Sequence, residues 1–185
     1  MKRNDLRDYT STEHLRDGRP VIIRAIRPDD KGLLIDALSK VSPDSLYLRL
    51  FSGKRKFSDD EVKQITAVDF VNVVGLVAVL EKEGIAQIVG GGRYVRIGPC
   101  GTGQSAEVAF LIDDAHQGLG IGSRLFKHLV AIARESGITR FEAEVLRTNA
   151  SMLTLFSRSG LPVFKTTAGG SVHVTIELTA AEANS

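Results

Sequence analysis

A chain of 185 residues with 43% hydrophobic and 25% charged residues has the length and composition of one globular domain with a full core. Its net charge of +2 at pH 7 argues against a nucleic-acid partner, and four histidines and one cysteine offer neither metal-ligand spacing nor an internal disulfide. The N-terminus lacks the apolar stretch of a signal peptide, and no apolar run is long enough to span a membrane. We therefore expect a cytoplasmic protein without metal, nucleic-acid or membrane partners.

The hydrophobic pattern predicts an α+β domain whose elements follow the order β-α-α-α-β-β-β-α-β-α-β. We expect one central mixed, mostly antiparallel sheet flanked by helices, with residues 1–19 as an N-terminal arm, 20–180 as the domain and 181–185 as a tail. Strands are expected over residues 21–27, 71–80, 85–95, 106–112, 139–146 and 172–178, and helices over residues 31–40, from 42 onward, 58–67, 121–136 and 150–159.

The helix over residues 121–136 has the clearest pattern. Ile121, Leu125 and Leu129 recur at helical spacing and form an apolar stripe for the core. Arg124 and His128 fall on the opposite, polar face, so we expect both to point into solvent.

A glycine-rich turn, with glycines at 118, 120 and 122, joins the preceding strand to this helix. Glycine lets a backbone approach a ligand closely because it has no Cβ. The unpaired N–H groups and the dipole at a helix start favour anions. A strand, a glycine-rich turn and a helix in this order predict a phosphate cradle.

Two other glycine patterns are weaker. Residues 98–105 nearly match a P-loop, but Gln104 stands where the phosphate-binding lysine belongs and a strand follows instead of a helix. The Gly118-x-Gly120-x-Gly122 run partly matches a dinucleotide fingerprint, but it lies five residues beyond the strand and Ser123 replaces the last glycine. We interpret the first as a hairpin loop and keep NAD binding as an alternative for the second.

The run Gln117-x-x-Gly120-x-Gly122 resembles the pyrophosphate signature of the GNAT superfamily of acyl-CoA N-acyltransferases. Glu107 on an apolar strand resembles the catalytic strand of that family. The residues Asn149, Leu155-Phe156 and Gly160-Leu161 resemble its downstream helix. Residues 16–30 and 42–51 look more specifically like the acetyltransferase domain of bacterial protein-lysine acetyltransferases of the Pat type.

The resemblance covers about residues 20–180 and implies a single GNAT-like domain that uses acetyl-CoA as cosubstrate. It implies that the turn holds the pyrophosphate, that free backbone groups of the preceding strand hold the pantetheine, and that two residues of the downstream segment contact the cosubstrate or an active-site water. The implied binding residues are Phe110, Leu111, Ile112, Gln117, Gly118, Leu119, Gly120, Ile121, Gly122, Ser123, Asn149 and Phe156.

The resemblance also implies Glu107 as the general base, because a protonated amine cannot attack a thioester. Burial among apolar neighbours would raise the pKa of its carboxyl group; an outward-facing surface glutamate stays open, because the strand alternates poorly. Phe156 stands where many members of the family place a tyrosine acid, so either water protonates the leaving thiolate or the thiolate leaves unaided.

We expect transfer of acetyl from acetyl-CoA to a primary amine, the side chain of a protein lysine. Alternatives are a GNAT enzyme for a small amine or antibiotic and a non-catalytic acetyl-CoA sensor, and a homodimer is left open. A deep acidic pocket would favour a small amine, and a shallow exposed cleft would favour a protein.

Several other residues are given structural interpretations. Asp113 and Asp114 are expected to end a strand, with a cationic substrate near the site as an alternative contact. Cys100 is expected to lie in a hairpin, and residues 54–56 to form a solvated basic loop, with the 3′-phosphate of CoA as an alternative contact. His116 adjoins the glycine-rich turn and is a candidate cosubstrate contact.

Overall fold

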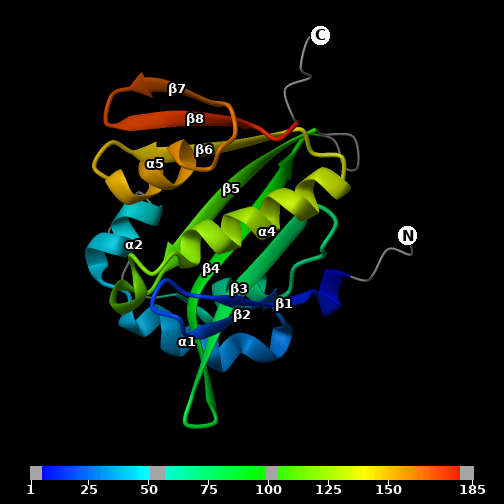
Figure 1. Cartoon of the computed structure of the whole chain (residues 1–185), viewed down its shortest axis with the longest axis vertical. Coiled ribbons are helices and arrows are strands. Elements are labelled where there is room, and N and C mark those ends of the chain that lie inside the picture. The colour runs from blue at the N-terminus through cyan, green and yellow to red at the C-terminus, as the bar shows by residue number, and fades with distance from the viewer. Residues whose placement is uncertain (1–5, 51–56, 99–103, 180–185) are drawn as a thin grey trace.

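The computed structural model describes residues 6–50, 57–98 and 104–179 (Figure 1). One eight-stranded sheet has the order β1-β2-β3-β4-β5-β6-β8-β7. The strands are β1 (Thr10–His14), β2 (Pro20–Ala25), β3 (Val73–Lys82), β4 (Ile85–Ile97), β5 (Ser105–Ile112), β6 (Arg140–Leu146), β7 (Val163–Ala168) and β8 (Ser171–Glu177). The helices are α1 (Lys31–Lys40), α2 (Pro43–Leu50), α3 (Asp59–Thr66), α4 (Ile121–Glu135) and α5 (Ala150–Ser157), with short 3-10 turns at Leu6–Asp8, Pro28–Asp30 and Asp114–His116.

This architecture confirms the expected α+β domain with a mixed, mostly antiparallel sheet. The pairing is antiparallel throughout except between β5 and β6. Each helix expected from the sequence is present, and α3 begins with the capping box of Ser58 and Glu61 that its sequence predicts.

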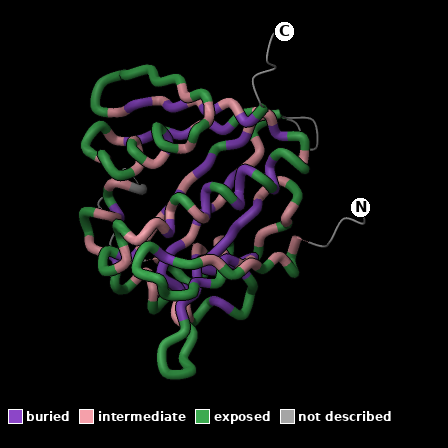
Figure 2. Tube along the Cα trace, viewed as in Figure 1, coloured by how far each residue is buried: buried purple, intermediate pink, exposed green. Residues whose placement is uncertain are grey.

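Two strands were missing from the expected order. Thr10–His14 forms β1, so this part of the arm is a hairpin partner of β2, and Val163–Ala168 forms β7. Both lie at the edges of the sheet, and neither contains a buried residue (Figure 2). Without a buried face they carry no apolar alternation, which is the signal that reveals a strand in a sequence.

Helix α4 crosses one face of the sheet and buries the apolar stripe expected from its sequence (Figure 1). The prediction for His128 was wrong, because this side chain is only 8% exposed. Its imidazole contacts the hydroxyl of Tyr9, and its Nε2 lies 3.1 Å from Oε1 of Glu13. A polar strand at the sheet edge therefore covers a helix face that would otherwise meet solvent.

The opposite face of β2–β4 packs against α1 and α3. A second, smaller apolar cluster forms there around Ile26, Val77 and Ile88, and Leu33 of α1 and Ile65 of α3 pack against it. The sheet is thus covered on both faces over its first half.

The sheet opens between β5 and β6. Strand β5 pairs with β4 along its whole length, but its parallel pairing with β6 is confined to residues 105–107. Beyond Glu107 the two strands diverge. Because successive backbone groups of a strand point alternately to its two neighbours, every second group of β5 beyond this point faces the gap.

Candidate active site

The glycine-rich turn places unpaired donors at the start of α4. Gly118 and Gly120 have φ values of 77° and 85°, the left-handed region that glycine adopts without strain. Among the described residues, the backbone N–H groups of residues 118–123 donate no hydrogen bond within the protein, whereas the next one, of Arg124, donates to the carbonyl of Gly120. The turn therefore presents a row of free donors at a helix N-terminus, as an anionic pyrophosphate requires.

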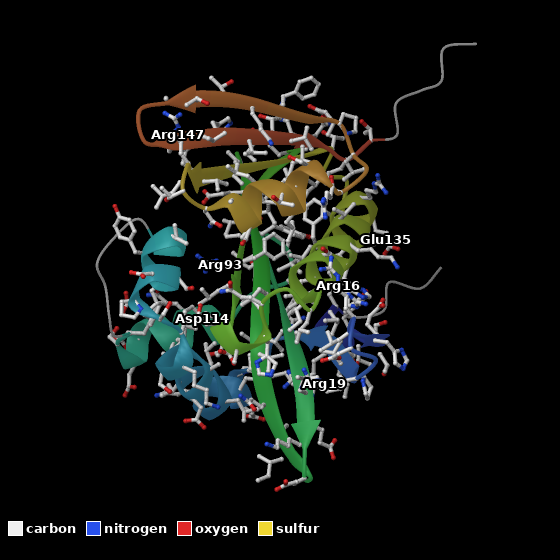
Figure 3. The ribbon with its side chains drawn as sticks, turned by 60° about the vertical axis from the view of Figure 1, so that its left-hand side comes forward. Arg16, Arg19, Arg93, Asp114, Glu135 and Arg147 are labelled. Carbon is white, nitrogen blue, oxygen red and sulfur yellow. The ribbon has the colours of Figure 1, made fainter. Side chains whose placement is uncertain are left out.

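Two arginines hold carbonyl groups of the turn and lie close to each other beside Gly120. Arg16, in the β1–β2 turn, donates from Nη1 to the carbonyl oxygen of Gly118 at 2.9 Å and from its backbone N–H to Leu119 at 3.1 Å. Arg124 donates from its own Nη1 to the carbonyl of Gly120 at 3.0 Å, and its buried Nε has no partner among the described residues. Figure 3 shows Arg16 extending from the hairpin towards α4. These contacts leave two positive charges beside the free donors.

Asp114 ties the same turn to α2. Its carboxylate accepts the backbone N–H of Ser42 at 2.6 Å, the hydroxyl of Ser45, and Nε2 of Gln117 at 3.0 Å. Partial burial would raise the pKa of Asp114, but the hydrogen bonds from Ser45 and Ser42 outweigh it and lower the pKa. Asp114 is thus an anionic link between α2 and the turn.

Asp113 and Asp114 end β5 as expected. Asp113 caps the 3-10 turn through the N–H of Ala115 and lies 2.8 Å from Nδ1 of His116. This contact turns His116 back onto the protein, so its interpretation as a cosubstrate contact stays a prediction.

A cavity of about 280 Å³ occupies the gap between β5 and β6. Asn149 and Phe156, which the resemblance selected, both line it together with Phe110. Asn149 accepts the N–H of Met152 at 3.1 Å and so caps α5, while the ring of Phe156 is fully buried against those of Phe110 and Phe126. Residues 107–110 of β5 form one wall of the cavity and residues 143–145 of β6 form another.

Glu107 lies at the last paired position of β5, where the strands begin to diverge. Its neighbours Ala106 and Val108 are buried beneath α4, so its side chain points to the opposite face of the sheet, and it borders the cavity. Glu107 is exposed, so the burial expected from its apolar neighbours is not found. A carboxylate that is open to solvent at the start of the gap can reach an amine that approaches from solvent.

A second cavity, of about 310 Å³, lies on the Glu107 face between the sheet and helices α1 and α3. Its lining is mostly apolar and contains three charged side chains, Glu61, Arg93 and Asp113. Arg93 pairs across the strands with Ala109 and is seen between α2 and α5 in Figure 3. The cavity therefore differs from the deep acidic pocket expected for a small amine.

The model of the acetyltransferase (GNAT) family matches residues 45–161, more than half of the chain. This chain belongs to the GNAT family of acetyltransferases. The matched segment contains Glu107, the gap, the glycine-rich turn and α5, whereas Arg16 lies before it.

Relatives within the GNAT family agree. A curated acetyltransferase of Pseudomonas aeruginosa is 30% identical over 143 residues, which cover 77% of this chain and 75% of that protein. The acetyltransferase Pat of Mycolicibacterium smegmatis is 32% identical over 146 residues, 79% of this chain, but only 42% of Pat is covered. The chain thus spans less than half the length of that relative.

The structural comparison gives the same family. The crystal structure of the GNAT domain of Streptomyces lividans PAT is 38% identical, with a TM-score of 0.81, and the match covers 91% of this chain and 96% of that one. The structure of yncA from Salmonella typhimurium, solved with acetyl-CoA, shares the fold at 18% identity and a TM-score of 0.67, covering 89% and 96% of the two chains. The protein is an acetyl-CoA-dependent acyltransferase of the GNAT fold, and the likeness to Pat-type domains is confirmed.

The fold brings together the residues that the resemblance had selected across about fifty positions of sequence. Glu107, Phe110, Asn149 and Phe156 line the cavity in the gap, whereas Leu111 lines the second cavity and the turn lines neither of the two. The sequence analysis did not predict the contacts of Arg16 and Asp114 with the turn. Arg16 contacts residues about a hundred positions away, and no local sequence pattern indicates such a contact.

Some predictions lie outside the described residues, namely the hairpin position of Cys100 and the basic loop at residues 54–56. Within the described ranges, no group of three histidine, cysteine, aspartate or glutamate side chains is arranged to hold a metal ion. Over the same residues, no helix is both long and apolar enough to cross a membrane.

Proposed function

We propose that this protein transfers the acetyl group of acetyl-CoA directly to the side-chain amine of a protein lysine, with Glu107 as the general base. The exposure of Glu107 at the start of the gap carries the proposal. A small substrate would be held in an enclosed pocket with acidic walls, whereas Glu107 stands on an open face. The Pat-type relatives support the same choice of a protein acceptor.

In this mechanism the turn and the two arginines hold the pyrophosphate, and the gap holds the pantetheine with the thioester near Glu107. Glu107 accepts a proton from the lysine ammonium, directly or through one water. The free amine attacks the thioester carbonyl, and a backbone N–H of β5 in the gap stabilises the oxyanion. The attacking nitrogen then loses its second proton to water, and collapse of the intermediate forms the amide and releases the CoA thiolate.

The departing thiolate takes its proton from water. Phe156 occupies the position of the usual tyrosine acid, and it is fully buried and has no hydroxyl group. A thiol with a pKa near about 8.5 is a tolerable leaving group without an acid. Because no general acid stands at this position, a second candidate function is an acetyl-CoA sensor that binds the cosubstrate without turnover.

The variant Glu107→Gln tests both functions. We expect acetylation of a lysine peptide to fall by about 10²–10⁴-fold, since this is the usual contribution of a general base. CoA and acetyl-CoA should still raise the melting temperature, and NAD should not. Thiol release reports turnover, and Glu81→Gln on the distant β3–β4 hairpin is the matched control. Binding without turnover in the unaltered protein would establish the sensor, and a shift with NAD alone would overturn the cradle.

A further inference from the structure

Within the part of the chain that the structure describes, one face of β8 and β7 is uncovered, and α2 contacts the neighbouring strands β5 and β6. Along β6 and β8 every second residue is buried beneath α4 and α5, and the alternate ones remain open. Lys165 of β7 marks the covered side, because its Nζ donates to Ser157 of α5 at 2.6 Å. The other side therefore carries the residues that neighbour Lys165 in the strand, Phe164 and Thr166, both exposed.

Glu107 begins a row that crosses this open face. It pairs with Glu142 of β6, which pairs with Thr175 of β8, which pairs with Phe164 of β7. Paired residues of neighbouring strands share a face. The row thus joins the proposed base to Phe164 at the sheet edge, whose side chain is 61% exposed.

A second row runs beside the first and adds another carboxylate. Glu144, His173 and Thr166 pair across β6, β8 and β7. Nδ1 of His173 lies 3.2 Å from Glu144, and its Nε2 lies 3.8 Å from Glu142, so the imidazole sits between the two acids. The side chains of Glu144 and His173 are 48% and 45% exposed.

Over the described residues, acids outnumber cations on this face. The acids are Glu107, Glu142, Glu144 and Glu177. The cations are Arg93 of β4 and Arg140 of β6, which pairs with Glu177 and whose Nε lies 3.4 Å from Glu142. The exposed Arg147 follows the end of β6 and bounds the face on its far side (Figure 3). An open acidic face that starts at the base complements a positively charged chain.

We propose that this face, defined by Glu142, Glu144, His173 and Thr166, docks a basic, extended segment of the protein that carries the acceptor lysine. The inference rests on the proposed function and specifies its acceptor. Strands lie about 4.8 Å apart and an extended chain rises about 3.3 Å per residue, so arginines within about three positions of the target lysine reach Glu142 and Glu144. Arginine binds carboxylates through two N–H groups, which makes it the favoured partner.

Three peptides with one lysine each test the charge preference. They differ only in the residues two and three positions from the lysine, which are arginine, glycine or glutamate. We expect kcat/KM for the arginine peptide to exceed that for the glutamate peptide on the order of tenfold, mainly through KM. The preference should shrink as salt rises from 0.05 to 0.5 M, because exposed charges are screened.

The double variant Glu142→Gln and Glu144→Gln should remove most of this preference, because exposed ion pairs each contribute a few-fold in affinity. Its matched control is Glu81→Gln with Glu83→Gln, which removes the same charge from the β3–β4 hairpin at the other end of the molecule (Figure 1). The KM for acetyl-CoA and the rate with the glycine peptide should stay unchanged in this control and in the single variant Glu142→Gln, because Glu144 lines the cavity in the gap and Glu142 does not. Thr166→Lys, on the exposed edge strand, should weaken the arginine peptide independently.

Each failure has its own signature. If no peptide is acetylated although acetyl-CoA binds, the proposed function fails. If peptides are acetylated without a charge preference, or the double variant keeps that preference, the docking face is wrong. If the variant instead changes the sedimentation of the free protein and leaves the peptide kinetics alone, a second copy of the chain covers this face and the inference is overturned.

Discussion

At the glycine-rich turn, side chains of two arginines lie beside free backbone N–H groups. The free N–H groups of the turn supply directional hydrogen bonds, while Arg16 and Arg124 add charge from two different elements. Both arginines also hold carbonyl groups of the turn, which keeps the opposite backbone N–H groups facing outward. In the proposed mechanism, binding of the pyrophosphate and order in the turn therefore depend on the same residues.

Replacing Arg16 by Gln should raise the KM for acetyl-CoA by roughly ten- to hundredfold, since hydrogen bonds to charged groups are worth about 1.5–3 kcal/mol. The turnover rate at saturating acetyl-CoA should stay unchanged, because Arg16 lies away from Glu107. Arg19→Gln is the control, because Arg19 occupies the same hairpin but pairs with Asp17. An unchanged KM in the Arg16 variant would restrict Arg16 to a structural contact.

At the scale of elements, the opening between β5 and β6 depends on close packing on the other side of β5. Gly92 of β4 pairs with Phe110, and a Cβ added at Gly92 would lie 2.6 Å from a carbon atom of that ring. Phe110 in turn packs on Phe126 and Phe156 and lines the gap. The absence of a side chain at Gly92 thus leaves room for the ring of Phe110, which forms part of the wall of the cavity between β5 and β6.

Gly92→Ala should destabilise the fold by about 1–3 kcal/mol, as overpacking of a core does, and should weaken acetyl-CoA binding because Phe110 must move. Gly91→Ala is the matched control, since its added Cβ would meet only the carbonyl oxygen of Leu76 at an ordinary 3.5 Å. Urea unfolding and the thermal shift with CoA measure the two effects. Equal stabilities of the two variants would contradict this account of the wall.

The elements that the sequence revealed are those with a buried face. Strand β8 alternates cleanly, and α4 has an apolar stripe, so both were predicted within a residue or two of their ends. The edge strands β1 and β7 contain no buried residue, and the sequence pattern did not predict them. Glu107 shows the limit for the site, because its strand has apolar residues on both faces and only the structure sets the direction of its side chain.

Across the whole molecule, the N-terminal hairpin pairs with the sheet through β2 and β3 and also contacts α4 through side chains. Tyr9 and Glu13 of the hairpin region hold His128 of α4, and Arg16 of the same region holds the turn where α4 starts. The segment before the family match thus contributes both to packing and to the site. Its loss would expose an imidazole and a helix face that are buried in the intact chain.

His128 should make the stability of the whole protein depend on pH. Burial lowers its pKa below the usual 6.5 and outweighs Glu13, which favours the charged form. Burial also raises the pKa of Tyr9, so Tyr9 keeps its proton and donates to the neutral ring. The unfolded chain therefore binds a proton more readily than the folded one, and stability is full above pH 6.5 and falls as the pH drops below it.

Urea unfolding at pH 7.5 and pH 5.5 measures this effect. The unaltered protein should lose more stability between the two values than His128→Gln, which cannot gain a proton in the unfolded state. His14→Gln is the matched control, since His14 is exposed on β1 and its loss should leave the pH dependence as it was. If the unaltered protein and His128→Gln lost equal free energy of unfolding between the two pH values, His128 would have the same pKa in the folded and unfolded chains. The buried contact between the hairpin and α4 would then accommodate an imidazolium.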